Sequence, residues 1–299
     1  MPLDPSSQLA RAKNKLRRAA ALMARPRDRQ KTIVSMTSYP ARIGYAEMVV
    51  RSLFAQSELA DLIVLYLSLD QFPEREADLP AGLLACRGMD FQIRWVEGDM
   101  RSHKKYLYAV RDFPNDLIIT VDDDILCRNT LVAELLEGHR KFPDAVVAIR
   151  AHVIRVGKDG RILPYGDWAM EIGIRHPEAV GVPSMAAFAT TGAGTLFAPG
   201  SLPEAAFDED AIRATCMTAD DIWLKAMTAI AGRKTVAVPG WMGADCIEGS
   251  QETSLWADNA QGGNNRALDL VREHCEKNLG VVSLDALLAD PAMERIVED

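Results

Sequence analysis

Short apolar segments alternate with longer amphipathic segments along most of the chain. Six runs are rich in Val and Ile and too short for helices, which predicts buried strands at Thr32 to Met36, Leu62 to Leu67, Phe91 to Val96, Leu117 to Val121, Val146 to Ile149 and Thr235 to Val238. Helical spacing predicts helices at Tyr45 to Gln56, Lys104 to Arg111, Thr130 to Lys141, Ala219 to Ala231 and Ala267 to Glu276. This alternation predicts an α/β fold with a mainly parallel central sheet flanked by helices.

The N-terminal segment has a different pattern from the rest of the chain. Between Gln8 and Met23 apolar residues recur at helical spacing, five basic residues occupy the other faces, and Pro26 ends the segment. We therefore expect a basic helical extension over residues 1–30, followed by a single domain over residues 31–299. Two interpretations remain open, a helix resting on an anionic membrane surface and a helix packed on the body of the protein.

Composition and charge exclude several classes of protein. The chain has 299 residues, of which 48% are hydrophobic and 25% charged, as in ordinary globular proteins. Residues 1–31 carry nine Lys/Arg and two Asp/Glu (+7), whereas the rest carries 25 and 40 (−15), so a nucleic-acid partner is not expected. The five cysteines are odd in number and contain no CxxC pair, which argues against a disulfide scaffold and a thiolate zinc site. With no apolar run of membrane-spanning length and no signal-peptide pattern, we expect a cytoplasmic protein.

Ligands of open α/β sheets bind at the carboxyl ends of the strands, so the residues after each predicted strand are the first candidates for a site. The first strand is followed by Thr37 to Arg42, which contains no glycine fingerprint of a Rossmann or P-loop site. A standard dinucleotide oxidoreductase or P-loop ATPase is therefore disfavoured.

Three consecutive carboxylates follow the fourth predicted strand. If the chain stays extended, Asp122 and Asp124 project to one side and Asp123 to the other. Two carboxylates aimed into one space repel unless a cation neutralises them, and Mg²⁺ or Mn²⁺ is a suitable partner. The alternative is a polar turn that caps the helix starting near Thr130, although Asn129 is better placed for that role.

The order of motifs along the chain resembles a poorly characterised family of bacterial nucleotide-sugar glycosyltransferases with the GT-A fold and an Asp-x-Asp motif. The segments that carry the resemblance are Ser35 to Ile43, Lys104 to Tyr106, Val121 to Ile125, Thr191 to Gly194 and Ala219 to Trp223. The resemblance implies a GT-A-like fold for the whole domain and a nucleotide diphosphate sugar, with UDP-sugar expected, as the donor.

The resemblance also assigns donor-site roles at the matching positions. Asp124 would coordinate the Mn²⁺ or Mg²⁺ that bridges the donor diphosphate, and Asp122 would contact the metal, the ribose or the sugar. Cations near the leaving diphosphate would stabilise the transition state. The expected donor-binding residues are Thr37, Tyr39, Arg42, Lys104, Lys105, Asp122, Asp123, Gly192 and Gly194. Two alternatives stay open: the lysines are ordinary solvated residues, or the glycines only form a tight turn.

A second acidic pair, Asp220 and Asp221, stands at the head of a predicted helix. Inverting transfer needs a carboxylate that takes a proton from the acceptor hydroxyl, and the resemblance assigns this role to Asp221, with Asp220 as the second choice. The competing interpretation is a capping box, since Asp221 follows Thr218 by three residues.

These observations together predict a metal-dependent, inverting glycosyltransferase that acts on a hydroxyl of a glycan or glycolipid. The alternatives are a metal-dependent nucleotidyltransferase or phosphohydrolase and a non-catalytic sugar-binding protein with the same fold. Contact with the inner membrane surface through residues 1–30 is a further expected interaction. No third protein ligand for the metal can be assigned from the sequence.

Overall fold

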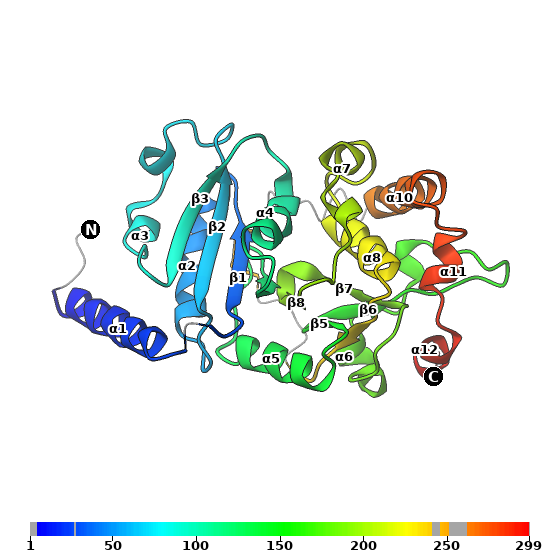
Figure 1. Ribbon diagram of the computed structural model, residues 1–299, viewed down its shortest axis with the longest axis horizontal. Helices are drawn as coiled ribbons and strands as arrows, with labels where there is room; N and C mark the ends of the chain where they lie inside the picture. The colour runs from blue at the N-terminus through cyan, green and yellow to red at the C-terminus, as the bar shows by residue number, and fades with distance from the viewer. Residues whose placement is uncertain (1–4, 27, 241–245, 251–261, 299) are drawn as a thin grey trace.

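A seven-stranded mixed sheet forms the centre of the molecule in the computed structural model, which describes residues 5–26, 28–240, 246–250 and 262–298 (Figure 1). The strand order is β3-β2-β1-β4-β8-β5-β9. Every neighbouring pair is parallel except those made by β8, which runs antiparallel to β4 and β5. The strands are β1 (Thr32–Thr37), β2 (Leu62–Ser68), β3 (Phe91–Val96), β4 (Leu117–Thr120), β5 (Val146–Ala148), β8 (Thr195–Phe197) and β9 (Thr235–Ala237).

All six predicted strands belong to this sheet, and their ends agree with the prediction within one residue. The predicted α/β architecture, a mainly parallel mixed sheet flanked by helices, is confirmed. A separate two-stranded antiparallel sheet of β6 (Ala151–Val153) and β7 (Ala187–Ala189) was not predicted. Its strands are too short to give a hydrophobic pattern that differs from a loop.

Helices cover both faces of the central sheet because successive strand residues point to opposite sides. Ile33 of β1 packs in a core with α4, α8 and α10, whereas the next residue, Val34, packs in a second core with α2 and α5. The helices are α1 (Pro5–Met23), α2 (Ile43–Phe54), α3 (Ala81–Leu84), α4 (Lys104–Asp112), α5 (Leu131–Lys141), α6 (Ile172–Arg175), α7 (Glu209–Thr215), α8 (Asp220–Ile230), α10 (Asn264–Asn278), α11 (Leu284–Leu288) and α12 (Pro291–Ile296). Among the described helices, none has the length and apolar character needed to span a membrane.

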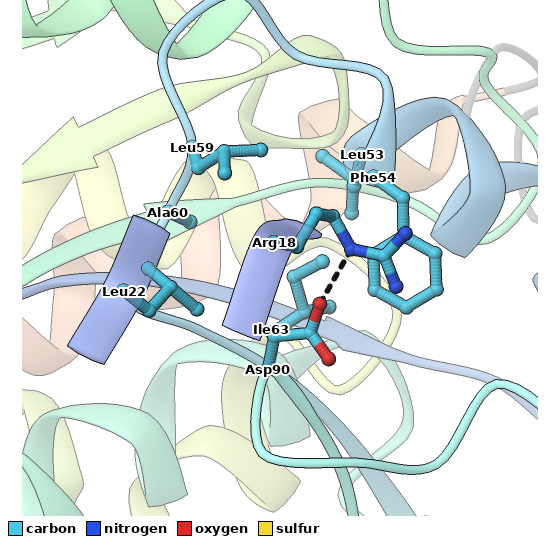
Figure 2. A pocket seen from close by; sticks show the side chains of 8 residues that line it. All are labelled: Arg18, Leu22, Leu53, Phe54, Leu59, Ala60, Ile63 and Asp90. Atoms are coloured by element: carbon cyan, nitrogen blue, oxygen red, sulfur yellow. Dashed lines mark hydrogen bonds and ion pairs between the residues drawn. The ribbon is translucent and has the colours of Figure 1, made fainter. Parts of the chain in front are cut away.

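The N-terminal helix α1 contacts the body of the protein through its basic side chains. Arg18 Nε lies 2.6 Å from a carboxylate oxygen of Asp90, and its guanidinium lies 3.7 Å from the centre of the Phe54 ring (Figure 2). Near the end of the segment, Arg25 pairs with Asp61 at 2.9 Å. The cavity at this junction has a volume of about 10 Å³, enough for about one water molecule and too small for a ligand. These contacts favour the interpretation in which the helix packs on the body.

The sheet order brings the ends of β1 and β4 together. The two strands pair in parallel with Ser35 opposite Thr120, so the loops that follow them leave the same edge of the sheet. Next to β4, the antiparallel strand β8 begins at this edge, and the short turn Thr191–Ala193 precedes it. The candidate site lies where these segments meet.

Candidate active site

The three carboxylates after β4 do not alternate as the sequence predicted. Asp123 and Asp124 are both buried and both pair with Nη2 of Arg42, which lies 2.8 Å from Oδ1 of Asp123. Asp122 instead accepts a hydrogen bond of 2.7 Å from Nζ of Lys105, and 38% of its side chain is exposed. The prediction that Asp122 and Asp124 share one side was wrong because β4 ends at Thr120 and the chain turns at Asp123 and Asp124.

Arg42 and Ser38, both from the loop after β1, hold the buried part of this cluster. The hydroxyl of Ser38 donates to Oδ2 of Asp123. Burial raises the pKa of Asp123 to about 7, although the charge of Arg42 and the Ser38 hydrogen bond oppose this shift. The guanidinium of Arg42 also lies 5.9 Å from the centre of the Tyr39 ring. The two predicted donor residues Tyr39 and Arg42 are thus adjacent to the acidic cluster.

Lys105 joins the acidic cluster to the second acidic pair. Its side chain is 2% exposed, and its Nζ lies 2.7 Å from Asp122 and 3.0 Å from Asp220. Burial alone would lower the pKa of Lys105, but the charges of Asp122 and Asp220 raise it, so the ammonium stays charged. The alternative of a solvated surface lysine is therefore wrong for Lys105.

Asp220 and Asp221 open helix α8 and differ in their environments. Asp221 Oδ1 accepts hydrogen bonds from both the backbone N–H of Thr191, at 3.0 Å, and the Thr191 hydroxyl, at 2.5 Å. The pKa of Asp220 falls to about 2 because Lys105 outweighs the effect of burial. Burial and the neighbouring charge of Asp220 raise the pKa of Asp221 to about 7. Two adjacent carboxylates with separated pKa values are the arrangement expected of an acid–base site.

The capping-box interpretation of Asp221 does not fit this structure. The N-cap residue of α8 is Ala219, which makes no side-chain capping hydrogen bond, and Asp221 accepts hydrogen bonds from Thr191. Thr191 was part of the resemblance but had no assigned role. The sequence could not identify it, because its contact to Asp221 joins two distant segments.

The two glycines of the turn before β8 have different roles. A Cβ on Gly192 would lie 1.9 Å from Oδ2 of Asp122, so any larger residue would force this carboxylate out of its present position. The backbone of Asp122 also donates to the Gly192 carbonyl at 2.9 Å. Gly194 has a φ of +109°, and a Cβ there would lie 2.9 Å from Leu131. Gly192 therefore shapes the site, whereas Gly194 faces the hydrophobic core.

Two predicted donor-binding residues already have protein partners in this structure. The ammonium of Lys104 is buried, pairs with Asp99 and lies 3.4 Å from Gln71, so it is separate from the pair formed by Lys105. The hydroxyl of Thr37 donates to the carbonyl of Tyr66 at 2.8 Å.

The described residues contain no group of three or more His, Cys, Asp or Glu side chains suited to a metal ion. Carboxylate oxygens are nevertheless the ligands that Mg²⁺ and Mn²⁺ prefer, and one or two suffice where substrate phosphates complete the coordination. Asp122 is the accessible carboxylate of the cluster, and the buried Asp124 has Arg42 as its counter-ion. The oxygen donors Asp122 and Asp124 thus fit a hard divalent cation in chemical type, with substrate oxygens as the further ligands.

Other residues considered from the sequence lie outside this cluster. Trp223 is fully buried and donates from Nε1 to the carbonyl of Ala206 at 3.0 Å, which makes it a core residue. His103 is also buried, between the Tyr106 hydroxyl and the Cys216 carbonyl. The polar composition of the segment from Trp256 to Arg266 predicts a loop that closes over the site or a plain connector, and most of this segment falls outside the described residues.

Comparisons with known proteins give similarity of structure only. No family model matches the chain, and no curated protein matches it. Solved structures similar to it include a mannosyltransferase from Pyrobaculum calidifontis in complex with GDP-Man and Mn²⁺ (12% identity, 97% of this chain, 88% of that chain, TM-score 0.46). A second is S. aureus TarS 1-349 (12% identity, 84% of this chain, 73% of that chain, TM-score 0.42). A third is 4-diphosphocytidyl-2C-methyl-D-erythritol synthase from Anaerococcus prevotii (16% identity, 78% of this chain, 98% of that chain, TM-score 0.45). At these values the similarity identifies no substrate, metal or reaction of this chain.

Proposed function

We propose that this chain is a glycosyltransferase that moves a sugar from a nucleoside diphosphate donor to a hydroxyl group of a glycan or glycolipid. The observation that carries the proposal is the contact of Lys105 with both Asp122 and Asp220. It brings one predicted donor carboxylate, Asp122, next to Asp220, the neighbour in sequence of the predicted base Asp221, and transfer between two substrates requires such proximity.

The proposed chemistry divides between the two acidic segments. Asp221 takes the proton of the acceptor hydroxyl while that oxygen forms a bond to the anomeric carbon. The bond from this carbon to the diphosphate oxygen breaks, and the nucleoside diphosphate leaves with the bonding electron pair. A base with a pKa near 7 is well suited to this step at neutral pH, and the raised pKa of Asp221 supports this assignment.

Arg42 is the proposed ligand of the donor phosphates. Its Nε is buried and has no hydrogen-bond partner among the described residues, so the guanidinium retains donor capacity. Asp122 and Asp124 are the proposed ligands of Mn²⁺ or Mg²⁺, which would supply positive charge at the leaving diphosphate. We retain Tyr39, Asp123 and Gly192 as parts of the donor site, because all three lie against Arg42 or Asp122.

Donor binding by three other predicted residues, Thr37, Lys104 and Gly194, stays a proposal. These residues contact other parts of the protein, so their role in donor binding would be indirect. The division into a basic extension over residues 1–30 and a domain over residues 31–299, and the cytoplasmic location with contact to a membrane surface, also remain proposals.

The test is incubation with Mn²⁺ or Mg²⁺ and a panel of UDP- and GDP-sugars, followed by measurement of the nucleotide products. A glycosyltransferase releases nucleoside diphosphate, by transfer or by slow hydrolysis. Nucleoside monophosphate or pyrophosphate would instead indicate a nucleotidyltransferase or phosphohydrolase, and no product with any donor would indicate a binding protein.

A further inference from the structure

A second charged pair lies at the same edge of the sheet. Arg150 follows β5 and precedes β6, and its Nη2 lies 2.8 Å from Oε1 of Glu171. Its Nη1 donates to the hydroxyl of Thr190 at 3.3 Å. The side chains are 23% and 31% exposed, so the pair is partly accessible to a ligand. None of the donor-site contacts described above involves this pair.

The backbone of Glu171 is held in an unfavourable conformation. Its φ of 52° and ψ of 53° lie in the left-handed region, which a residue with a Cβ rarely adopts. The N–H of Glu171 donates to Nδ1 of His152 at 2.8 Å. Burial lowers the pKa of His152 to about 3, so the ring stays neutral and Nδ1 remains an acceptor. Strained residues that persist are concentrated at ligand-binding and catalytic positions, because the surrounding structure must hold them there.

An aromatic side chain lies beside His152, the residue that accepts from the backbone of Glu171: the centres of the Tyr165 and His152 rings are 6.0 Å apart. The Tyr165 ring is only partly buried and contacts Trp168, with ring centres 4.8 Å apart, and Phe188, at 6.0 Å. Burial raises the pKa of the Tyr165 hydroxyl, the negative charge of Asp221 raises it further, and Arg150 lowers it. The Tyr165 hydroxyl is therefore influenced by the charges of both Asp221 and Arg150.

Three consecutive residues connect these groups in order. Thr190 accepts from Arg150, Thr191 donates to Asp221, and the Gly192 carbonyl accepts from the backbone of Asp122. Along this segment the proposed base is thus placed between the donor carboxylate and Arg150. A sugar acceptor must approach the base from a side that the donor leaves open.

We propose that Arg150, Glu171 and Tyr165 form the acceptor-binding subsite and that it binds a neutral sugar ring. This inference rests on the proposed function. A guanidinium supplies N–H donors, a carboxylate accepts hydrogen bonds from hydroxyl groups, and an aromatic ring offers an apolar surface with a polar tip. The charges of Arg150 and Glu171 cancel, so the pair has no net attraction for a phosphate or carboxylate ligand.

The experiment measures binding of methyl hexopyranosides by saturation-transfer NMR and calorimetry, with hexose 6-phosphates as charged counterparts. Glu171→Gln keeps the side-chain shape and removes the charge, whereas Tyr165→Ala removes the ring and Tyr165→Phe removes only the hydroxyl. The matched control is Glu178→Gln, because that carboxylate is exposed and faces His176 at 3.5 Å. Thermal unfolding of each variant confirms that it is folded.

We expect at least one methyl hexopyranoside to bind the native protein, with affinity reduced about tenfold or more in Glu171→Gln and Tyr165→Ala and unchanged in the control. The inference is overturned if no methyl hexopyranoside binds at tens of millimolar, if binding is unchanged in both variants, or if a hexose 6-phosphate binds more tightly than its neutral counterpart. Binding of UDP and GDP with Mn²⁺ is measured separately. If the native protein binds a methyl hexopyranoside but neither UDP nor GDP, the proposed function is contradicted and the sugar-binding subsite stands. If it binds a nucleotide but no methyl hexopyranoside, the subsite alone is contradicted.

Discussion

Asp122 and Asp220 both pair with one ammonium group, that of Lys105, although they come from the end of β4 and the start of α8. Lys105 is almost fully buried, so little solvent screens these interactions. The geometry of the donor carboxylate and the ionisation of the acidic pair therefore depend on the same residue.

Replacing Lys105 with Met should damage both the fold and the reaction. Removing one partner of a buried ion pair typically costs about 3–5 kcal/mol, because the remaining charges lose their counter-ion. We expect a clear loss of unfolding free energy in urea and a large loss of nucleoside diphosphate release. Lys105→Arg keeps the charge and should recover part of the stability. Native turnover in Lys105→Met would show that the contact has no catalytic importance.

Asp221→Asn should separate catalysis from stability. The amide oxygen can still accept from the N–H and hydroxyl of Thr191, but it cannot take a proton, so turnover should fall by about 10²–10⁴-fold. Turnover of the native protein should rise with pH through about 7, as Asp221 loses its proton. A variant with turnover within a few fold of the native protein would exclude Asp221 as the base.

The stability of the same variant has a predicted pH dependence. The pKa of Asp221 is raised from 3.8 to about 7 on folding, so the folded protein holds this proton at pH values where the unfolded chain has lost it. Its contribution to stability is fully present below pH 3.8 and declines as the pH rises to about 7. The difference in melting temperature, Asp221→Asn minus native protein, should therefore be larger (more in favour of the variant) at pH 8 than at pH 5, as measured by thermal unfolding. Equal differences at both pH values would contradict the raised pKa.

In Asp124→Asn, Mn²⁺ or Mg²⁺ should no longer raise turnover to the native level, because the variant lacks a proposed charged ligand of the metal. Activity measured against metal concentration tests this. Asp123→Asn is the comparison, since this carboxylate is held by Arg42 and Ser38. We expect it to keep the metal response, and a metal response retained by Asp124→Asn but lost in Asp123→Asn would reverse the assignment.

Gly192→Ala should displace the carboxylate of Asp122, because the new Cβ would lie 1.9 Å from Oδ2. We expect a large loss of turnover and a lower melting temperature. Gly44→Ala is the matched control: it lies in α2 with nothing within 4 Å of the added methyl group and should stabilise the helix by up to about 1 kcal/mol. Similar activities in the two variants would mean that the position of Asp122 is unimportant.

Six strands of the central sheet and the longer helices α1, α2, α4, α5, α8 and α10 were predictable from the sequence, because Val- and Ile-rich runs and helical spacing are local signals, whereas short elements such as β6 and β7 were not. The acidic residues Asp122, Asp124 and Asp221 were proposed as site residues from local motifs and from resemblance. The sequence predicted that Asp122 and Asp124 share one side, whereas in the structure Asp123 and Asp124 share Arg42 and Asp122 contacts Lys105. This difference was not predictable, since it depends on where β4 ends. Arg150 and Tyr165 carried no local signal, because their relation to Asp221 arises only when segments far apart in the sequence come together in the fold.

The decisive experiment for glycosyl transfer by a base at the head of α8 measures nucleoside diphosphate release from a panel of nucleotide sugars, with Mn²⁺, by the native protein and by Asp221→Asn. We expect release from at least one donor by the native protein and a loss of about 10²–10⁴-fold in the variant, with both proteins folded. Equal release by the two proteins, or release of monophosphate or pyrophosphate instead of diphosphate, would contradict it.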